Sequence, residues 1–207
     1  LLVATYTGQA IAPHLIKLTF DPIKDLTPIA LIVTVPNVLV MNVQTALRLN
    51  IGNVRELIAY LKKNPAKINY GSGGNGSAGH LAGELFKTQA GVFMVHIPYG
   101  GGPGAQMGLL SGQVDLNFDN LAAASANIRS AKLKALAVTT ARRSSAMPEV
   151  PTVAESGADL GLARFDIHTW FGLFGPAKLP PEITARLNRG FADALNSADV
   201  KARLATL

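Results

Sequence analysis

The sequence contains no cysteine, and aromatic residues make up only 6% of its 207 residues. Without cysteine the chain has no disulfide framework and no thiolate metal site. Charged residues are also sparse, at 15%, and the net charge of +6 comes from basic residues that are scattered in pairs. A nucleic-acid-binding protein usually clusters its basic residues and interleaves them with aromatics. The composition therefore argues against nucleic acid as a partner.

Long hydrophobic runs are absent as well. The most apolar stretch, residues 29–41, is interrupted by Thr34, Pro36 and Asn37, whereas a membrane-spanning helix needs about 20 consecutive apolar residues. We expect no direct membrane insertion. Hydrophobic residues still make up 48% of the chain, which is a globular composition and too apolar for a disordered protein. The length suits one large domain or two small ones.

Apolar runs alternate with helical periodicities along the chain. Pro36 breaks one run into two predicted strands, because proline is poorly tolerated in a central strand. Strands alternating with helices indicate α/β layers with a largely parallel sheet. The predicted strands are residues 1–5, 29–35, 38–41, 67–70, 92–98, 113–118, 133–139 and 169–174, and the predicted helices are 53–63, 78–90, 105–110, 121–129 and 181–195. The first strand is expected to be buried. At the start of the first helix, Asn53 with Glu56 three residues later resembles a capping box.

A glycine-rich stretch is the strongest sign of a site. Residues 69–84 read N-Y-G-S-G-G-N-G-S-A-G-H-L-A-G-E and lie between a predicted strand and a predicted helix. Glycine is costly to order, so a run of glycines usually brings a backbone close to something. A loop that enters a helix N-terminus offers free N–H groups, and here two hydroxyls, which suits an anion. The alternative is a tight turn in which Ser77 caps the helix.

Enzymatic interpretations of this loop lack essential parts. Gly71 to Gly76 fit the G-x-G-x-x-G dinucleotide fingerprint, but the next predicted strand brings no acidic residue for the ribose. The loop has no lysine, which excludes a P-loop. Ser77, His80 and Asp119 can be drawn as a triad, yet no serine here lies in a G-x-S-x-G elbow. An enzyme using the loop for a nucleotide or an acyl substrate stays open as the alternative to binding without chemistry.

The histidines give no sign of a metal site. His14, His80, His96 and His168 are far apart in the sequence, and none has an i, i+4 partner of the H-E-x-x-H kind. His96, in a predicted strand, is more simply explained as a satisfied core or surface residue. The residues therefore predict no metal and no cofactor.

Several motifs occur in an order that is typical of one family. After L-T-F-D-P-I-K-D-L-T-P-I-A near the start come the glycine-rich stretch, H-I-P-Y-G-G-G, L-S-G-Q-V-D-L-N-F-D-N, L-K-A-L-A-V-T-T, P-E-V-P-T-V-A-E-S-G and W-F-G-L-F-G-P-A. In this order they resemble the Bug family, the substrate-binding proteins of tripartite tricarboxylate transporters. The resemblance covers nearly the whole chain.

The resemblance implies a type II periplasmic binding protein fold, in which two α/β lobes close on a ligand like a Venus flytrap. Residues 37–166 would form lobe 2, and residues 1–36 and 167–207 would be parts of lobe 1. Family members place a strand, a glycine-containing loop and a helix before these residues, so lobe 1 would be incomplete here. The implied function is that of a periplasmic solute-binding protein, not an enzyme, which delivers a small carboxylate to the permease subunits of its transporter.

The expected ligand site has two parts in lobe 2. The backbone N–H groups of Gly76, Ser77 and Ala78 would bind one carboxylate, together with the hydroxyls of Ser72 and Ser77. Asp119 would lie at the cleft edge and accept a hydrogen bond from a ligand hydroxyl or amine. Its alternative role is to cap the helix that is predicted to begin at residue 121.

The resemblance also assigns residues to the walls of the cleft. Thr5 and Thr7 would face the cleft from lobe 1, after the first predicted strand. Tyr99 would either line the cleft or pack against the protein.

Overall fold

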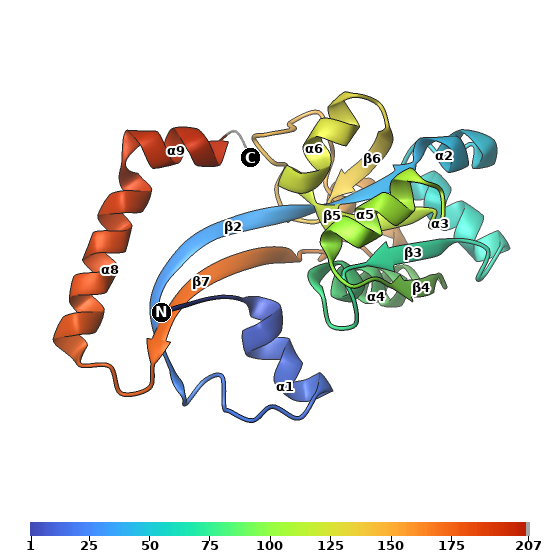
Figure 1. Ribbon diagram of the computed structural model, residues 1–207. Coiled ribbons are helices and arrows are strands. Elements are labelled where there is room, and N and C mark those ends of the chain that lie inside the picture. The colour runs from blue at the N-terminus through green and yellow to red at the C-terminus, as the bar shows by residue number, and fades with distance from the viewer. Residues whose placement is uncertain (206–207) are drawn as a thin grey trace. The chain divides into compact units, whose positions relative to one another are not determined.

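The computed structural model describes residues 1–205, which divide into two compact units (Figure 1). Unit 1 comprises Leu1–Thr34 and the chain from Thr169 onward, and unit 2 comprises Val35–His168. The chain therefore passes twice between the units. The expected lobe limits at residues 36 and 166 stay a prediction, because compactness alone does not demonstrate closure on a ligand.

Unit 2 is built on a mixed sheet. Its β3 (Asn69–Ser72) runs parallel to both β4 (Val95–Pro98) and β5 (Leu116–Asn120). The second half of β2 (Leu26–Asn42) is antiparallel to β5 and to β6 (Leu133–Val138). The expectation of a largely parallel sheet was therefore wrong for β2. Apolar runs identify buried strands but do not encode the direction in which a strand enters the sheet.

Pro36 does not divide β2, so the prediction of two separate strands was also wrong. β2 is one continuous strand of 17 residues. Its ladder with β5 begins at Asn37, which pairs with Asn120. Pro36 therefore precedes this ladder, and its missing N–H removes no hydrogen bond from it.

Helices cover both faces of the unit 2 sheet. The predicted helices are confirmed as α3 (Val54–Lys63), α4 (Ala78–Ala90), α5 (Gly102–Leu110) and α6 (Leu121–Arg129). The short helices α2 (Val43–Leu49) and α7 (Val153–Gly157) and the 3₁₀ turn η2 (Ala158–Leu160) were not predicted, since one or two turns give little periodicity.

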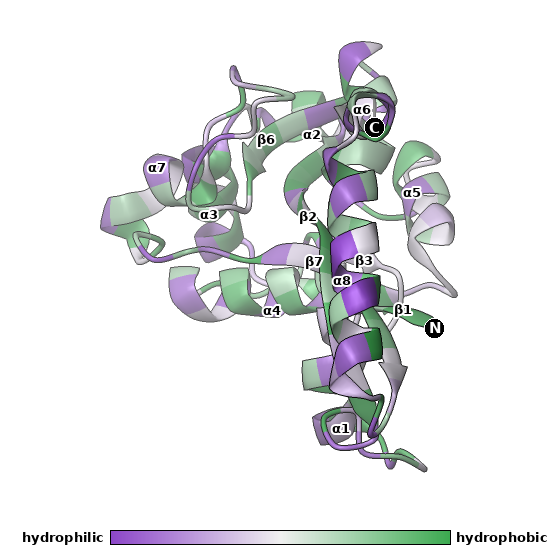
Figure 2. Cartoon of the chain, turned by 90° about the vertical axis from the view of Figure 1, so that its left-hand side faces the viewer, coloured by the Kyte–Doolittle hydropathy of each residue, from purple (hydrophilic) through white to green (hydrophobic). Residues whose placement is uncertain are grey.

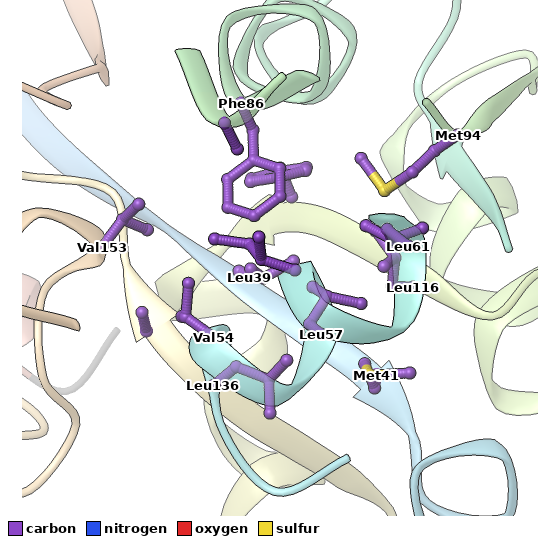
Figure 3. Packing of buried hydrophobic residues seen from close by; sticks show 14 of the residues in the cluster. Leu39, Met41, Val54, Leu57, Leu61, Phe86, Met94, Leu116, Leu136 and Val153 are labelled. Atoms are coloured by element: carbon purple, nitrogen blue, oxygen red, sulfur yellow. The ribbon is translucent and has the colours of Figure 1, made fainter. Parts of the chain in front are cut away.

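Alternation along β2 separates the two halves of the core. Leu39 and Met41 pack with α3, α4 and α7, whereas Val38 and Val40 pack with α5 and α6. Figure 3 shows the first half, a buried cluster to which Leu39, Leu57 and Phe86 all belong. Each fully buried side chain of this size contributes about 1.5–3 kcal/mol relative to exposure. This two-sided core holds the loops at the ends of the strands in place.

Unit 1 pairs β1 (Leu2–Thr5) with β7 (His168–Pro176) in antiparallel register. The expectation of a buried first strand was wrong, because Leu2 and Val3 are 44% and 58% exposed. The apolar composition of β1 does not reveal that these two side chains are exposed to solvent. The remaining elements are η1 (Thr7–Ile11), α1 (Ala12–Leu15), α8 (Pro181–Asn196) and α9 (Ala198–Ala205).

Helix α8 mixes apolar and polar residues (Figure 2). It contacts the first part of β2, since the Asn188 side chain donates to the Ile29 carbonyl oxygen at 2.7 Å. Ile183 on this helix is 39% exposed. Among residues 1–205, no helix is long and apolar enough to cross a membrane.

Candidate functional site

The glycine-rich stretch connects the end of β3 to the start of α4. Ser77 is the N-cap, and its Oγ accepts a hydrogen bond from the backbone N–H of His80 at 3.4 Å. The predicted cap is therefore confirmed. The helix begins with the N–H groups of Ala78 and Gly79, for which an α-helix offers no carbonyl partner. Capping and anion binding do not exclude each other, because the cap engages only one N–H of the first turn.

The glycines of this loop approach another part of the chain. A Cβ atom at Gly73 would lie 3.0 Å from the backbone nitrogen of Gly102, so the second glycine loop packs directly against the first. Gly74 and Gly76 have φ angles of 117° and 77°, a region that L side chains rarely adopt. The dinucleotide-like spacing is thus explained by chain packing and turn geometry.

Two stacked histidines lie against the loop. The rings of His80, from α4, and His96, from β4, have centroids 4.2 Å apart and planes inclined by 23°. His80 Nδ1 accepts a hydrogen bond from the Gly76 N–H at 3.0 Å. His96 Nε2 lies 2.6 Å from Ser72 Oγ. The interpretation of His96 as a satisfied residue is confirmed.

Several of the expected ligand donors already have partners. The N–H of Gly76 donates to His80, and the N–H of Ser77 donates to the Gly74 carbonyl at 3.1 Å. Ser72 Oγ also contacts Gly74, at 3.1 Å from both its N–H and its carbonyl oxygen. The N–H of Ala78 makes no hydrogen bond to a side chain in the described part of the chain. Two of the three expected backbone donors, the N–H groups of Gly76 and Ser77, are therefore engaged within the protein.

A second hydrogen-bonded group lies next to the histidine pair. The Tyr70 hydroxyl donates to Glu84 Oε1 at 2.6 Å, and Lys87 Nζ contacts the same oxygen at 2.7 Å. Burial acts to raise the pKa of Glu84, but the hydrogen bonds from Lys87 and Tyr70 outweigh it and hold that pKa below its usual value. Burial also raises the pKa of Tyr70 well above its usual range.

Burial lowers the pKa of His96 to about 4, and positive charge at His80 is the next largest cause. The ring of His96 also stacks on Tyr70, with centroids 4.9 Å apart. His96 is therefore held as a neutral ring near neutral pH.

The structure does not assemble the Ser77–His80–Asp119 triad that the sequence allowed. Ser77 Oγ contacts the backbone of His80, and the His80 ring is bonded to Gly76. Asp119 accepts instead from Gln106 Nε2 at 3.0 Å and from the Asn120 N–H at 2.8 Å. No hydrogen bond joins the three side chains within residues 1–205. The components of nucleophilic catalysis are thus not in contact.

Asp119 lies near the end of β5 in a partly buried position. Burial raises its pKa, and the hydrogen bonds from Gln106 and Asn120 oppose this increase. The alternative role of Asp119 as a helix cap was wrong, because α6 begins at Leu121 and its cap is Asn120, which accepts from the Ala123 N–H. The Gln106 partner was not predicted, since no sequence pattern pairs a glutamine on a short helix with a distant strand end.

Tyr99 packs against α5. Any Cβ atom at Gly108 would overlap its hydroxyl and ring. The hydroxyl donates to Gln113 Oε1 at 3.3 Å. Of the two roles expected for Tyr99, packing is the one observed.

Thr5 and Thr7 lie together in unit 1. Their Oγ1 atoms are 2.8 Å apart, at the end of β1. Burial raises the pKa of the intervening Tyr6 to about 12. The participation of both threonines in a ligand site stays a prediction, as does that of Ser72, Gly76, Ser77, Ala78 and Asp119. Within the described residues, no group of three or more His, Asp or Glu side chains is arranged to hold a metal ion.

Comparison with known proteins gives one consistent family. A family model described as "Tripartite tricarboxylate transporter family receptor" matches residues 1–206. BugT of Bordetella pertussis is 35% identical over 184 residues, which are 89% of this chain and 54% of the relative. A protein of Agrobacterium vitis is 31% identical over 205 residues, which are 99% of this chain and 56% of the relative. The chain thus spans about half the length of the curated relatives it matches.

Solved structures of similar proteins have the same fold as this chain. R. palustris Rpa4515 with adipate has a TM-score of 0.85 at 32% identity, covering 98% of this chain and 66% of that one. MatC from Rhodopseudomonas palustris with bound malate has a TM-score of 0.84 at 30% identity, covering 99% and 67%. The periplasmic binding protein BugD has a TM-score of 0.84 at 31% identity, covering 99% and 66%. The expected periplasmic-binding-protein fold is confirmed.

Proposed function

This chain belongs to the tripartite tricarboxylate transporter receptor family, and from that premise we propose that it serves as a solute-binding protein in the periplasm. In this role it captures a small carboxylate anion and delivers it to the membrane permease of its transporter. The observation that carries the proposal is the family match across residues 1–206. Similar proteins solved with adipate and with malate make dicarboxylates the first ligands to test.

The start of α4 supports anion binding in this role. The N–H groups of Ala78 and Gly79 and the Ser77 hydroxyl lie at the positive end of a helix of 13 residues. Hydrogen bonds to a charged group contribute about 1.5–3 kcal/mol each. The helix dipole adds about 0.3–1 kcal/mol. This site therefore orients a carboxylate through the backbone, which leaves the rest of the ligand to other residues.

Tight binding of a ligand requires contacts from more than one loop. A micromolar Kd corresponds to a net binding free energy of about 8 kcal/mol. Because binding also costs entropy, the contacts at α4 are not enough, and other residues must contribute. Thr5, Thr7 and Asp119 are the residues that we propose for the other ligand groups. An acceptor such as Asp119 would select a ligand that carries a hydroxyl or an amine.

A thermal-shift screen of the full-length protein tests the proposal. Malate and adipate are the probes, with NAD and ATP as contrasts for a nucleotide-binding enzyme. A ligand at about 100 times its Kd adds about 2.7 kcal/mol of stability, which raises the melting temperature by several degrees. Stabilisation by a carboxylate and not by the nucleotides supports the proposal. Stabilisation by NAD or ATP alone overturns it.

A further inference from the structure

Each end of the glycine loop is tied to one ring of the same histidine pair. At the start of the loop, Ser72 Oγ lies 2.6 Å from His96 Nε2. At its end, the Gly76 N–H donates to His80 Nδ1 over 3.0 Å. The two rings stack at 4.2 Å and come from different elements, β4 and α4. The stack therefore joins the two ends of the loop through side chains of its neighbours.

The hydrogen bond from Gly76 fixes the protonation state of His80. A backbone N–H can only donate, so the Nδ1 atom that faces it must carry no proton. In imidazolium both ring nitrogens carry protons. Protonation of His80 would thus place two donors against each other and break the bond to Gly76.

The surroundings of His96 oppose a positive charge on its ring, because burial and then positive charge at His80 lower its pKa. The two ring centroids lie 4.2 Å apart, so like charges on the rings would repel each other. Glu84 favours protonation of His96 and Lys87 opposes it, but these two form an ion pair at 2.7 Å. The Tyr70 hydroxyl donates to the same carboxylate.

We propose that His80 and His96 are positioning residues for the loop from Ser72 to Gly76, and that the loop keeps its binding conformation only while His80 Nδ1 carries no proton. Protonation of His80 releases Gly76, loosens the loop and weakens carboxylate binding. The effect on a ligand rests on the proposed function, whereas the effect on the loop does not. The pair therefore makes affinity depend on pH without touching the ligand.

Matched variants of His80 distinguish the contribution of its hydrogen bond from that of its side-chain volume. His80→Asn keeps an acceptor near the position of Nδ1 and cannot titrate, whereas His80→Leu removes the acceptor. His14→Asn is the control, because this exposed histidine lies in unit 1. If His80→Leu does not fold, His96→Gln keeps a hydrogen-bonding group for Ser72 without the ring stack and takes its place.

The first measurement needs no ligand. Nuclear magnetic resonance of the ¹⁵N-labelled full-length protein reports the protonation of His80 Nδ1 and the hydrogen exchange of the Gly76 amide. We expect an unprotonated Nδ1 in the wild type, and a protected Gly76 amide both in the wild type and in His80→Asn. The protection of this amide, taken relative to its intrinsic exchange rate at the same pH, should be lower in His80→Leu and at acid pH. A protonated Nδ1, or equal exchange in all variants, overturns the proposal whether or not a ligand is known.

The second measurement is calorimetry with malate and adipate at a series of pH values from neutral to acid. Wild-type affinity should fall toward acid pH. His80→Leu should bind about tenfold more weakly at every pH, the equivalent of one hydrogen bond, and His80→Asn should restore affinity and flatten the profile. Affinity that rises in His80→Leu would mean that His80 competes with the ligand for Gly76 and would overturn the proposal. If neither acid binds the wild type while the loop data hold, the choice of dicarboxylate ligands fails and the role of the pair in the loop stands.

Discussion

A Cβ atom at Gly79 would lie 2.7 Å from the carbonyl oxygen of Phe118. Because this oxygen belongs to the backbone of β5, it cannot rotate away as the end of a flexible side chain would. Gly79 is the second residue of α4. The absence of a side chain at this position is therefore what allows the first turn of the helix, with its free N–H groups, to lie against the end of β5.

Gly79→Ala should destabilise the protein by about 1–3 kcal/mol, the usual cost of overpacking. It should also weaken carboxylate binding, since α4 must move away from β5. Urea unfolding measures the first effect and calorimetry with malate the second. Gly100→Ala is the matched control, because no atom lies within 4 Å of its Cβ position. Equal stability of the two variants would show that α4 relaxes without cost.

Local signals in the sequence were enough to predict the elements around the site. α4 was predictable because its apolar residues recur at helical spacing and both ends carry a signal, the cap at Ser77 and the left-handed Gly91. The cap of α3 was predicted at Asn53, which accepts from the Glu56 N–H. The Glu56 side chain instead contacts the N–H of Gly52, so the expected capping box is only half formed.

Contacts between distant segments were not predictable in the same way. His80 stacks on His96, and Asp119 bonds to Gln106. Each of these contacts depends on how α4, α5 and the strand ends approach one another, which composition and spacing do not encode. The family was identified from the order of motifs along the whole chain, whereas the glycine loop alone left a cofactor site, an anion site and a turn open.

Gly76→Val should abolish carboxylate binding and leave the far-ultraviolet circular dichroism nearly unchanged. Gly76 has a φ angle of 77°, where a β-branched residue costs about 1–2 kcal/mol or more, so the loop should change shape while the helices persist. Gly76→Asn is the control, since asparagine tolerates the left-handed region. Calorimetry with malate compares the affinities of the two variants. Full affinity in the valine variant would mean that the loop is only a turn and does not bind the ligand.

Asp119→Asn should make the protein more stable at neutral pH. Burial raises the pKa of Asp119, so the folded state holds the proton more tightly than the unfolded state does. As the pH falls through this raised pKa, the side chain takes up a proton and the free energy of unfolding of the wild type increases. Asparagine does not titrate, so the variant lacks this increase. Urea unfolding of both proteins at a series of acid pH values measures the difference. Parallel curves would mean that Asp119 titrates as it does in the unfolded chain.

His96→Gln should flatten the loss of stability on the acid side. Burial lowers the pKa of His96 from 6.5 to about 4, so the unfolded state binds this proton more readily than the folded state does. The neutral ring therefore contributes fully to the free energy of unfolding above about pH 6.5, and its contribution is lost as the pH falls toward about 4. Glutamine does not titrate and keeps a group within reach of Ser72.

The measurement for this variant is urea unfolding of the wild type, His96→Gln and the control His14→Asn at pH steps across that interval. The wild type and the control should lose stability together, and His96→Gln should lose less of it. Because the raised pKa of Asp119 changes stability with the opposite sign, the comparison is made as a difference between variants at each pH. Identical slopes in all three proteins would show that the His96 ring is no harder to protonate in the folded protein than in the unfolded chain.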